Sequence, residues 1–445
     1  MNRAPGGTTH PSASTNECAS AQGPLVIRWV FPAPQTTALV DGVVFGRDAS
    51  ANVILSGHEA SRRHAQVKRS GAIPTLHDLD SRNGTWVNAQ RITERPVGPR
   101  DVVRIGEWVG VIVECPDDGL LDLRELGAGW YGSAALARAI EPARRVASTN
   151  LPVIVEGETG AGKEGMARAI HAWSGRSGAF VAVNCAAIPP AMAEGELFGY
   201  RKGAFTGADR SSPGLVRAAH GGTLFLDEIL DIPPPLQAKL LRVLEQGEVW
   251  PLGETTAVRI DARFVCATQE PLRQAVADRR FRADLLARLD GLTVVLPPLR
   301  DRREDVAPLF ARLLHEQTGG RMPVLDPKLV EALLTYDWPL NVRELVLLVR
   351  RLLAVHGHEA TLKRSMLPER VLGAMRTGSQ PLATPARAST ADDVAFDRLV
   401  DALRQHAGNV SRAAQALGIT RSRAYRLLEA RPEFDVRSLR DEAGS

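Results

Sequence analysis

The pattern of apolar and polar positions changes character along the chain. Between residues 23 and 115, short apolar alternations such as 25–30 and 85–87 are separated by Gly, Asp, Asn and Pro. Many short strands with frequent turns predict a β-sandwich. Residues 1–22 are rich in Gly, Ser and Thr, and we expect them to form a disordered leader.

A second pattern follows an acidic connector at residues 116–129. From residue 130 to 297, strand-like apolar runs alternate with helical patterns, which predicts a mostly parallel sheet with helices on both faces. The five runs are 151–155, 179–183, 223–226, 263–267 and 293–296. Residues 298–375 show helical patterns alone, residues 376–391 form a linker rich in Ser, Thr, Ala and Pro, and residues 392–445 hold a small helical unit with a tail.

The composition is that of a globular protein with several domains. A chain of 445 residues with 44% hydrophobic and 24% charged residues is too long for one ordinary core. No apolar run approaches the roughly 20 residues needed to cross a bilayer, and the beginning of the chain has no long apolar signal core. We therefore expect a cytoplasmic protein with no membrane partner. The net charge is only +4, so contact with nucleic acid requires a local basic patch.

The four cysteines, Cys18, Cys115, Cys185 and Cys266, are scattered and lack the spacing of metal ligands. Cys185 and Cys266 lie in apolar runs, which favours buried, reduced thiols.

A glycine-rich loop, Gly157-Glu158-Thr159-Gly160-Ala161-Gly162-Lys163-Glu164, follows the first strand-like run of the parallel sheet. Its glycines let backbone N–H groups approach phosphates, and Lys163 would neutralise the β- and γ-phosphates of a nucleotide. A simple glycine-rich turn is the alternative, but strand, loop, lysine and helix occur in the order that a phosphate-binding loop requires. Glu164 stands where the generic motif has a Ser or Thr that contacts Mg²⁺.

Asp227 and Glu228 follow a purely apolar run and would lie at the carboxyl edge of the sheet. Asp227 can hold Mg²⁺, directly or through water, and Glu228 can polarise an attacking water. An isolated Asp-Glu pair is usually a solvated turn, but a phosphate-binding loop upstream favours the catalytic interpretation. The predicted activity is an ATPase that uses ATP and Mg²⁺.

Between these two nucleotide motifs lies Gly203-Ala204-Phe205-Thr206-Gly207-Ala208. An ATPase core with this hexapeptide resembles the AAA+ activators of the sigma-54 form of bacterial RNA polymerase, which also have Glu at the position of Glu164. The resemblance implies that residues 203–208 contact sigma-54, chiefly through Phe205 and Thr206, and that ATP hydrolysis drives promoter opening. Composition alone leaves open an ordinary loop whose Phe205 folds into the core.

The same resemblance implies further roles around the nucleotide. Asn184 would switch the position of Glu228, Thr268 would be the first nucleotide sensor, and Arg343 the second sensor on a helical lid. Leu340, near Arg343, stands where the family usually has Gly.

Arg282 and Arg288 match the arginines that reach the γ-phosphate of a neighbouring subunit. A guanidinium suits this role because its fork binds phosphate oxygens, although either residue could instead make a structural ion pair. A site completed by a neighbour implies a ring, which the resemblance makes a hexamer or, in some forms, a heptamer.

The N-terminal region carries three loop motifs: Gly46-Arg47, Ser61-Arg62-Arg63-His64 and Ser81-Arg82-Asn83-Gly84-Thr85-Trp86-Val87-Asn88. Together they resemble the forkhead-associated (FHA) domain, an eleven-strand sandwich that binds phosphothreonine peptides. Arg47, Arg62 and the Ser61 hydroxyl would bind the phosphate, and Asn83 the ligand backbone. His64 and Asn88 are expected to hold the loops. The implied partner is a phosphothreonine protein of a Ser/Thr kinase pathway, or another copy of this chain.

Near the end of the chain, a turn containing Gly418 separates two short helical patterns, as in a helix-turn-helix. The segment resembles the Fis-type DNA reader. Six arginines and one acid lie between Arg404 and Arg431, an excess that suits phosphate contact, although a solvated helical hairpin is the alternative. The residues expected to contact DNA are Thr420, Arg421, Ser422, Arg423 and Arg426.

These features predict a multidomain protein with an all-β FHA sandwich, an α/β AAA+ ATPase with a helical lid, and an all-α helix-turn-helix. The predicted function is a transcriptional activator that binds upstream enhancer DNA, assembles a ring and opens promoters with sigma-54 RNA polymerase. Phosphothreonine recognition would regulate it, in place of the receiver domain of two-component-like signalling. The alternatives are an AAA+ remodeller without promoter activity and a phosphothreonine adaptor with an inactive ATPase core, which intact Lys163, Asp227 and Glu228 oppose.

Overall fold

The computed structural model describes residues 24–69, 71, 73–115, 124–205, 208–377, 399–400, 402–403 and 410–417. The chain separates into two compact units, Met1–Gly378 and Ser379–Ser445, which are treated separately below.

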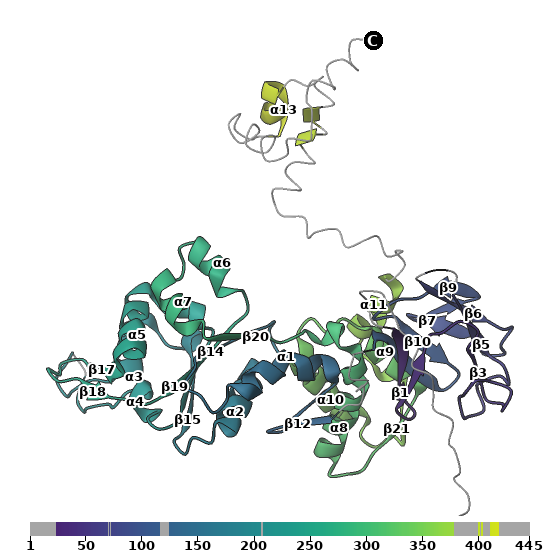
Figure 1. Cartoon of the computed structure of the whole chain (residues 1–445), viewed down its shortest axis with the longest axis horizontal. Coiled ribbons are helices and arrows are strands. Elements are labelled where there is room, and N and C mark those ends of the chain that lie inside the picture. Colours follow the sequence, from purple (N-terminus) through teal and green to yellow (C-terminus); the bar gives the residue numbers. More distant parts are fainter. Residues whose placement is uncertain are drawn as a thin grey trace, which may run out of the picture. The chain divides into compact units, whose positions relative to one another are not determined.

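Eleven strands of the first unit form the N-terminal β-sandwich, drawn in purple and blue in Figure 1. One sheet has the order β2-β1-β11-β10-β7-β8 and the other β4-β3-β5-β6-β9. The strands are β1 (Leu25–Phe31), β2 (Gln35–Ala38), β3 (Val44–Gly46), β4 (Val53–Ile54), β5 (Ala65–Arg69), β6 (Pro74–Asp78), β7 (Thr85–Val87), β8 (Gln90–Ile92), β9 (Glu94–Pro96), β10 (Val102–Ile105) and β11 (Trp108–Glu114). The predicted FHA sandwich is confirmed.

The core of the sandwich is built around Trp29, which is fully buried. Its ring meets Phe45 and Trp108 edge to face, with ring centroids 5.8 Å and 6.0 Å apart. Because Trp29 and Trp108 lie on one sheet and Phe45 on the other, these contacts join the two layers.

The connector expected at residues 116–129 is partly a strand. β12 (Arg124–Gly127) pairs with β13 (Trp130–Gly132) as an antiparallel hairpin, and Leu126 is buried. Leu126 packs with the apolar side chains of the next domain, so the domain boundary lies before residue 124. The hairpin is too short to show an alternating pattern in the sequence.

A parallel sheet of five strands, in the order β15-β16-β19-β14-β20, forms the centre of the next domain. All five predicted strands are present, as β14 (Val153–Glu156), β15 (Phe180–Asn184), β16 (Thr223–Asp227), β19 (Arg263–Thr268) and β20 (Leu292–Val295). Leu224 and Leu226 belong to one apolar cluster and Phe225 to another, so both faces of the sheet are covered, as expected for parallel strands.

The elements around this sheet are α1 (Ala134–Arg145), α2 (Lys163–Ser174), η1 (Cys185–Ala187), α3 (Pro190–Phe198), α4 (Leu215–Ala218), η2 (Ile229–Asp231), α5 (Pro234–Gln246), α6 (Leu272–Ala277) and α7 (Ala283–Leu289). A small hairpin, β17 (Glu248–Val249) with β18 (Val258–Arg259), projects beyond α5 (Figure 1).

The lid consists of α8 (Val306–Thr318), α9 (Pro327–Thr335), α10 (Asn341–His356) and α11 (Glu369–Thr377), with short turns η3 (Leu299–Asp301), η4 (Arg303–Asp305) and η5 (Arg364–Met366). It is not purely helical as the sequence predicted, because β21 (Val324–Leu325) pairs in parallel with β22 (Thr361–Leu362). These two-residue strands are too short to show periodicity.

In the second unit the structure describes one helix, α13 (Val410–Ala416). The predicted DNA-contacting residues, Thr420, Arg421, Ser422, Arg423 and Arg426, lie outside the described residues.

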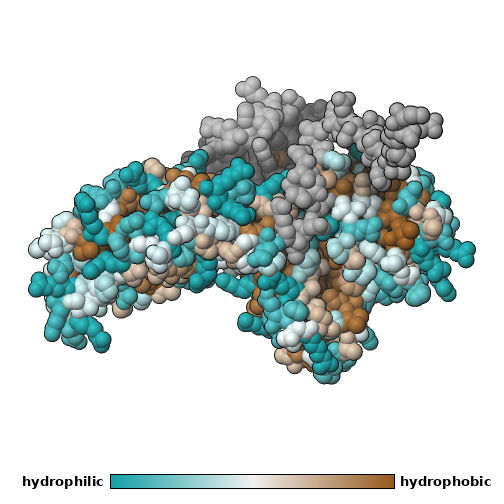
Figure 2. Space-filling model, turned by 60° about the horizontal axis from the view of Figure 1, so that its bottom comes forward, coloured by the Kyte–Doolittle hydropathy of each residue, from teal (hydrophilic) through white to brown (hydrophobic). Residues whose placement is uncertain are grey.

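Among the described residues, no helix is both long enough and apolar enough to cross a bilayer. The face in Figure 2 is a mosaic of hydrophilic and apolar residues.

Cys185 and Cys266 are buried free thiols, as predicted, and burial raises the pKa of the Cys185 thiol to about 12.

Candidate functional site

Four polar side chains lie at the carboxyl edge of the parallel sheet because the strand register aligns their strands. Asn184 of β15 pairs with Asp227 of β16, and Glu156 of β14 pairs with Thr268 of β19. Burial raises the pKa of Asp227, and the neighbouring charge of Glu228 adds to this effect while Lys163 opposes it. Asp227 and Glu228 therefore lie at the carboxyl edge of the sheet, where the sequence analysis expected them.

The phosphate-binding loop connects β14 to α2 at the same edge. Gly160 and Gly162 have φ values of +76° and +108°, in the left-handed region that favours glycine. Lys163 is 7% exposed, and its Nζ donates to the carbonyl of Gly157 at 2.8 Å and lies 3.8 Å from Oε1 of Glu228. A buried ammonium beside a glycine-rich loop can bind a phosphate group.

Glu228 is held by a residue that the sequence analysis did not identify. Its Oε1 accepts a hydrogen bond of 2.7 Å from Nε2 of Gln269, whose Oε1 in turn accepts from the Thr159 hydroxyl at 2.9 Å. Gln269 therefore ties the carboxylate to the phosphate-binding loop. The one feature of the sequence that could have identified Gln269 is its position directly after Thr268, where β19 ends.

Asn184 and Thr268 make local contacts. The Asn184 side chain accepts from the backbone N–H of Ala186 at 3.0 Å and caps η1. The Thr268 hydroxyl is buried and donates to the carbonyl of Glu270 at 2.8 Å. Asn184 is brought beside Asp227, and in the described structure the hydrogen-bond partner of Glu228 is Gln269 rather than Asn184.

The lid closes the other side of the phosphate-binding loop. Arg300 makes two hydrogen bonds with the carboxylate of Glu158, at 2.8 and 2.5 Å, and lowers the pKa of that carboxyl. The buried Asn341 donates to Glu158 and to the carbonyl of Thr159 at 3.2 and 3.0 Å. Sequence reasoning did not identify Arg300 or Asn341, because their partners lie more than a hundred residues away.

The predicted second sensor, Arg343, stands directly over the loop. A Cβ atom built on Gly160 would lie 3.0 Å from the Cβ of Arg343 and 2.2 Å from the carbonyl oxygen of Leu340. The backbone N–H of Val342 also donates to the carbonyl of Gly160 at 3.1 Å. The Leu at position 340 therefore leaves the lid in close contact with the loop.

The two arginines predicted to act in trans lie on the surface around α7. Arg282 is exposed and forms an ion pair of 2.6 Å with Asp284, and Arg288 is exposed at the other end of the helix. Within the described part of the chain, no hydrogen bond or ion pair joins either arginine to the phosphate-binding loop of its own subunit.

Of the hexapeptide at residues 203–208, the structure describes Gly203, Ala204, Phe205 and Ala208, and Thr206 and Gly207 lie outside the described residues. Gly203 has φ +81°, and its N–H donates to the carbonyl of Ala208 at 2.9 Å. Phe205 is 49% exposed, and its ring meets that of Tyr200 edge to face with centroids 5.0 Å apart. The Phe side chain is therefore half covered by its own loop and half available to a partner.

The predicted phosphothreonine residues gather on loops at one edge of the sandwich. The side chains of Arg47, Arg62 and Asn83 are exposed, and a Cβ on Gly46 would lie 2.0 Å from the carbonyl oxygen of Arg62. Only glycine at position 46 allows that approach. In the described residues, neither guanidinium is engaged in a hydrogen bond or ion pair, so both remain available to an anion.

Hydrogen bonds hold these loops together, with His64 placed as the sequence analysis expected. Nδ1 of the buried His64 accepts from the N–H of Ser61 at 3.0 Å, and Nε2 donates to the carbonyl of Gly84 at 3.2 Å. The Ser61 hydroxyl accepts from the N–H of Arg82 at 3.1 Å, and Asn83 donates to the carbonyl of Glu59 at 2.8 Å. These hydrogen bonds join two of the three predicted loop motifs, 61–64 and 81–88, to one another, and the second of these to Glu59.

Four family models match successive parts of the chain: the FHA domain over residues 43–106, the Sigma-54 interaction domain over 130–295, the AAA+ ATPase lid domain over 300–383, and the Bacterial regulatory protein, Fis family, over 391–426. The transcriptional regulatory protein GlrR of Escherichia coli (strain K12) is 38% identical over 313 residues, covering 69% of each chain. The chain belongs to the sigma-54-dependent transcriptional regulators.

Other relatives in this family differ in length. The phenol regulator MopR of Acinetobacter guillouiae is 40% identical over 306 residues, and the match covers 66% of this chain and 55% of MopR. This regulator thus spans little more than half the length of some relatives.

Among solved structures, NtrX from Brucella abortus in complex with ATP has 32% identity and a TM-score of 0.50, covering 69% of this chain and 70% of NtrX. The Sigma-54 interaction domain of this regulator is an AAA+ domain, which implies ATPase activity.

Proposed function

We propose that this regulator hydrolyses ATP in a ring and uses the energy to remodel sigma-54 RNA polymerase from upstream DNA sites in the cytoplasm. The observation that carries the proposal is the half-exposed Phe205, presented by a glycine-containing turn on the same domain as the nucleotide site. An apolar ring kept partly in water suits a surface that a protein partner covers.

The residues at the sheet edge fit ATP and Mg²⁺. Lys163 and the N–H groups of the glycine loop would hold the phosphates, and Arg343 and Thr268 would sense them from the lid and the sheet. Mg²⁺, when bound, neutralises phosphate charge, and Asp227 is its ligand, directly or through water. Glu228 orients and polarises the attacking water. NtrX from Brucella abortus, which resembles this chain, has been solved with ATP and with ADP.

The surface position of Arg282 and Arg288 supports completion of each site by a neighbouring subunit. A guanidinium stabilises the charge on the transferred phosphoryl group, so an exposed arginine that makes no contact with the phosphate-binding loop of its own subunit, among the described residues, can act through assembly. We infer a ring, with six subunits by family resemblance.

Control by phosphothreonine is the regulatory part of the proposal. Arg47, Arg62 and the Ser61 hydroxyl supply donors for a phosphate, and Asn83 supplies a bond to the ligand backbone. The ligand is a phosphothreonine protein, and the Fis-type unit, through Thr420, Arg421, Ser422, Arg423 and Arg426, reads the DNA.

The decisive experiment measures ATP-dependent open-complex formation on a sigma-54 promoter. Phe205→Ala is compared with Met192→Ala, because Met192 is an apolar side chain of similar exposure, 55% against 49%, outside the loop. We expect Phe205→Ala to keep ATP turnover and lose promoter opening, and Met192→Ala to keep both. Thr206→Ala should behave as Phe205→Ala does.

Undiminished opening by Phe205→Ala would reject the loop as the sigma contact. ATP turnover without opening by the parent, even with phosphothreonine peptide added, would favour a remodeller that acts on another protein.

A further inference from the structure

The FHA sandwich and the lid share one apolar cluster. Val102 of β10 and Val109 and Val111 of β11 pack with lid residues that include Leu329 and Val330 of α9. All five side chains are fully or almost fully buried. The outer face of this sheet is therefore an interface with the lid rather than a solvated surface, and this interface lies within the first unit.

A buried ion pair lies at the same interface. Nε of Arg104, on β10, donates to Oε2 of Glu331, on α9, at 2.8 Å, and the two residues are 4% and 2% exposed. Oε1 of Glu331 has no hydrogen-bond partner among the described residues. Since a buried charge without its partner is strongly unfavourable, each of these two residues depends on the other domain.

Arg104 also connects to the phosphothreonine loops. Its guanidinium carbon lies 4.7 Å from the ring centroid of Trp86, the residue paired with it on β7. The Trp86 Nε1–H donates to the carbonyl of Asn83 at 3.1 Å. A direct chain of contacts thus runs from Asn83 through Trp86 and Arg104 to Glu331.

The lid continues this chain to the nucleotide site. Nη1 of Arg303 donates to the carbonyls of Leu334 and Thr335, at the end of α9, at 3.0 and 3.2 Å. The buried Trp338 donates to the carbonyl of Leu333 at 2.9 Å, and three residues later Asn341 contacts the phosphate-binding loop.

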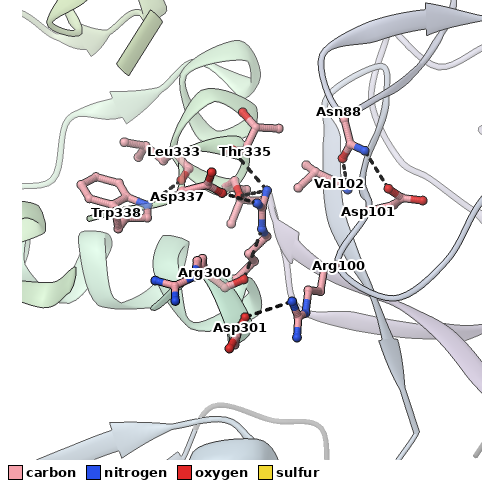
Figure 3. A network of polar contacts seen from close by, with 12 residues as sticks. Asn88, Arg100, Asp101, Val102, Arg300, Asp301, Leu333, Thr335, Asp337 and Trp338 are labelled. Atoms are coloured by element: carbon pink, nitrogen blue, oxygen red, sulfur yellow. Dashed lines mark hydrogen bonds and ion pairs between the residues drawn. The ribbon is translucent and has the colours of Figure 1, made fainter. Parts of the chain in front are cut away.

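A second link lies beside the first. Arg100 of the sandwich forms an ion pair of 3.1 Å with Asp301, next to Arg300, which holds Glu158 of the phosphate-binding loop. Figure 3 shows the ion pair between Arg100 of the sandwich and Asp301 of the lid.

We propose that the FHA domain uses this face as an intramolecular docking surface for the lid. Through Trp86, Arg104 and Glu331, it couples phosphothreonine binding to nucleotide binding. The inference rests on the ligands proposed above for the two sites. Arg47, Arg62 and Asn83 stay exposed while the lid is docked, so a phosphothreonine ligand binds without displacing it. Coupling between two binding sites is reciprocal, so each ligand changes the affinity for the other by the same factor.

The test measures the affinity of the full chain for a fluorescent ADP analogue. The titration is made with and without a degenerate peptide pool carrying a central phosphothreonine, and the unphosphorylated pool is the control. We expect the phosphorylated pool to change the ADP affinity by at least about fivefold, and ADP to change the peptide affinity by the same factor. Trp86→Leu should abolish the change while both ligands still bind. Trp250→Leu, which replaces a tryptophan that is 50% exposed and outside the interface, should keep it.

If both ligands bind the parent chain without changing each other's affinity, the coupling is rejected. If the phosphorylated pool fails to bind, the phosphothreonine assignment is rejected together with the coupling, and the docking surface is tested separately by hydrogen exchange. Arg104→Met or Glu331→Met alone should raise exchange in α9, and the double variant should restore protection because no unpaired charge remains. Unchanged exchange in both single variants would overturn the docking surface.

Discussion

Glu228 adopts a left-handed backbone conformation, with φ +51°, that residues other than glycine seldom take. Such a conformation costs on the order of 1–3 kcal/mol and persists where the surroundings hold it. The hydrogen bond from Gln269 is one of these restraints, and it also fixes the direction of the carboxylate.

We predict that Gln269→Met slows ATP turnover by about tenfold or more and leaves the nucleotide affinity nearly unchanged. The variant removes a hydrogen bond to a charged group, worth about 1.5–3 kcal/mol, from Glu228, the residue that we propose positions the attacking water. Steady-state turnover and equilibrium nucleotide binding measure the two effects. Gln246→Met, at an exposed position at the end of α5, is the control, and equal turnover in the two variants would refute the role of Gln269.

His64 makes the stability of the FHA domain depend on pH. Burial lowers its pKa below the ordinary value of 6.5, against the opposing effects of the Gly84 carbonyl and Asp78. The unfolded chain therefore takes up a proton before the folded one as pH falls. The stabilisation is complete above about pH 6.5 and is lost as pH decreases through that value toward the folded pKa.

We therefore expect the sandwich to become more susceptible to proteolysis as pH is lowered from 7.5 to 5.5, about the ordinary histidine range. His64→Gln should remove most of this pH dependence, and His358→Gln, at a side chain that is 77% exposed, should leave it intact. Mass spectrometry of cleavage within residues 24–115 provides the measurement. The same pH profile in His64→Gln as in the parent would contradict the assignment.

At the level of elements, the phosphate-binding loop and the start of α10 form one structure. We predict that Gly160→Ala weakens nucleotide binding by roughly tenfold or more, because its Cβ would collide with the Leu340 carbonyl and overpacking costs about 1–3 kcal/mol. Gly175→Ala, at the end of α2, is a matched control with a similar φ, +69° against +76°, and open space around its Cβ. Calorimetric titration distinguishes the two variants, and equal losses would mean that backbone strain alone matters.

The elements that the sequence predicted well are those whose signal is local. The three consecutive positions Leu224, Phe225 and Leu226 are apolar because both faces of their strand are covered, so β16 was predictable from composition alone. The loop motifs were equally local, since glycines, Lys163 and the strand before them are neighbours in sequence.

Contacts between distant segments left no such signal. Arg104 interrupts an apolar strand, which on its own suggests a solvated position, and its partner Glu331 lies 227 residues further along the chain. Gln269 likewise gains its role from Thr159, 110 residues earlier in the chain, and Asn341 from the packing of the lid against the phosphate-binding loop. The sequence therefore suggested the candidate catalytic groups and missed most of the residues that hold them in place.

At the scale of the whole molecule, the exposed arginines around α7 lead to a prediction about assembly. Glu228→Gln and the double variant Arg282→Ala/Arg288→Ala should each hydrolyse ATP poorly. Mixing them should restore activity, because a subunit with an intact Glu228 then meets a neighbour with intact arginines. For random mixing in a closed ring, about a quarter of the sites are complete.

The turnover of equimolar mixtures tests this prediction. Arg273→Ala removes an arginine that is 82% exposed from the same surface and should remain active alone. Mixtures no more active than their components would show that the arginines act within their own subunit or serve only structure.

Tyr200 links the segment that leads into Gly203 and Phe205 to neighbouring parts of the domain. It bridges Ser212 on one side and Leu252 on the other, and Leu252 also donates to the carbonyl of Gly199. The base of the turn is thus fastened to the neighbouring hairpin formed by β17 and β18. A force on Phe205 would therefore act on both the segment around Tyr200 and the segment around Leu252. A movement that displaces one of these segments would also displace the other.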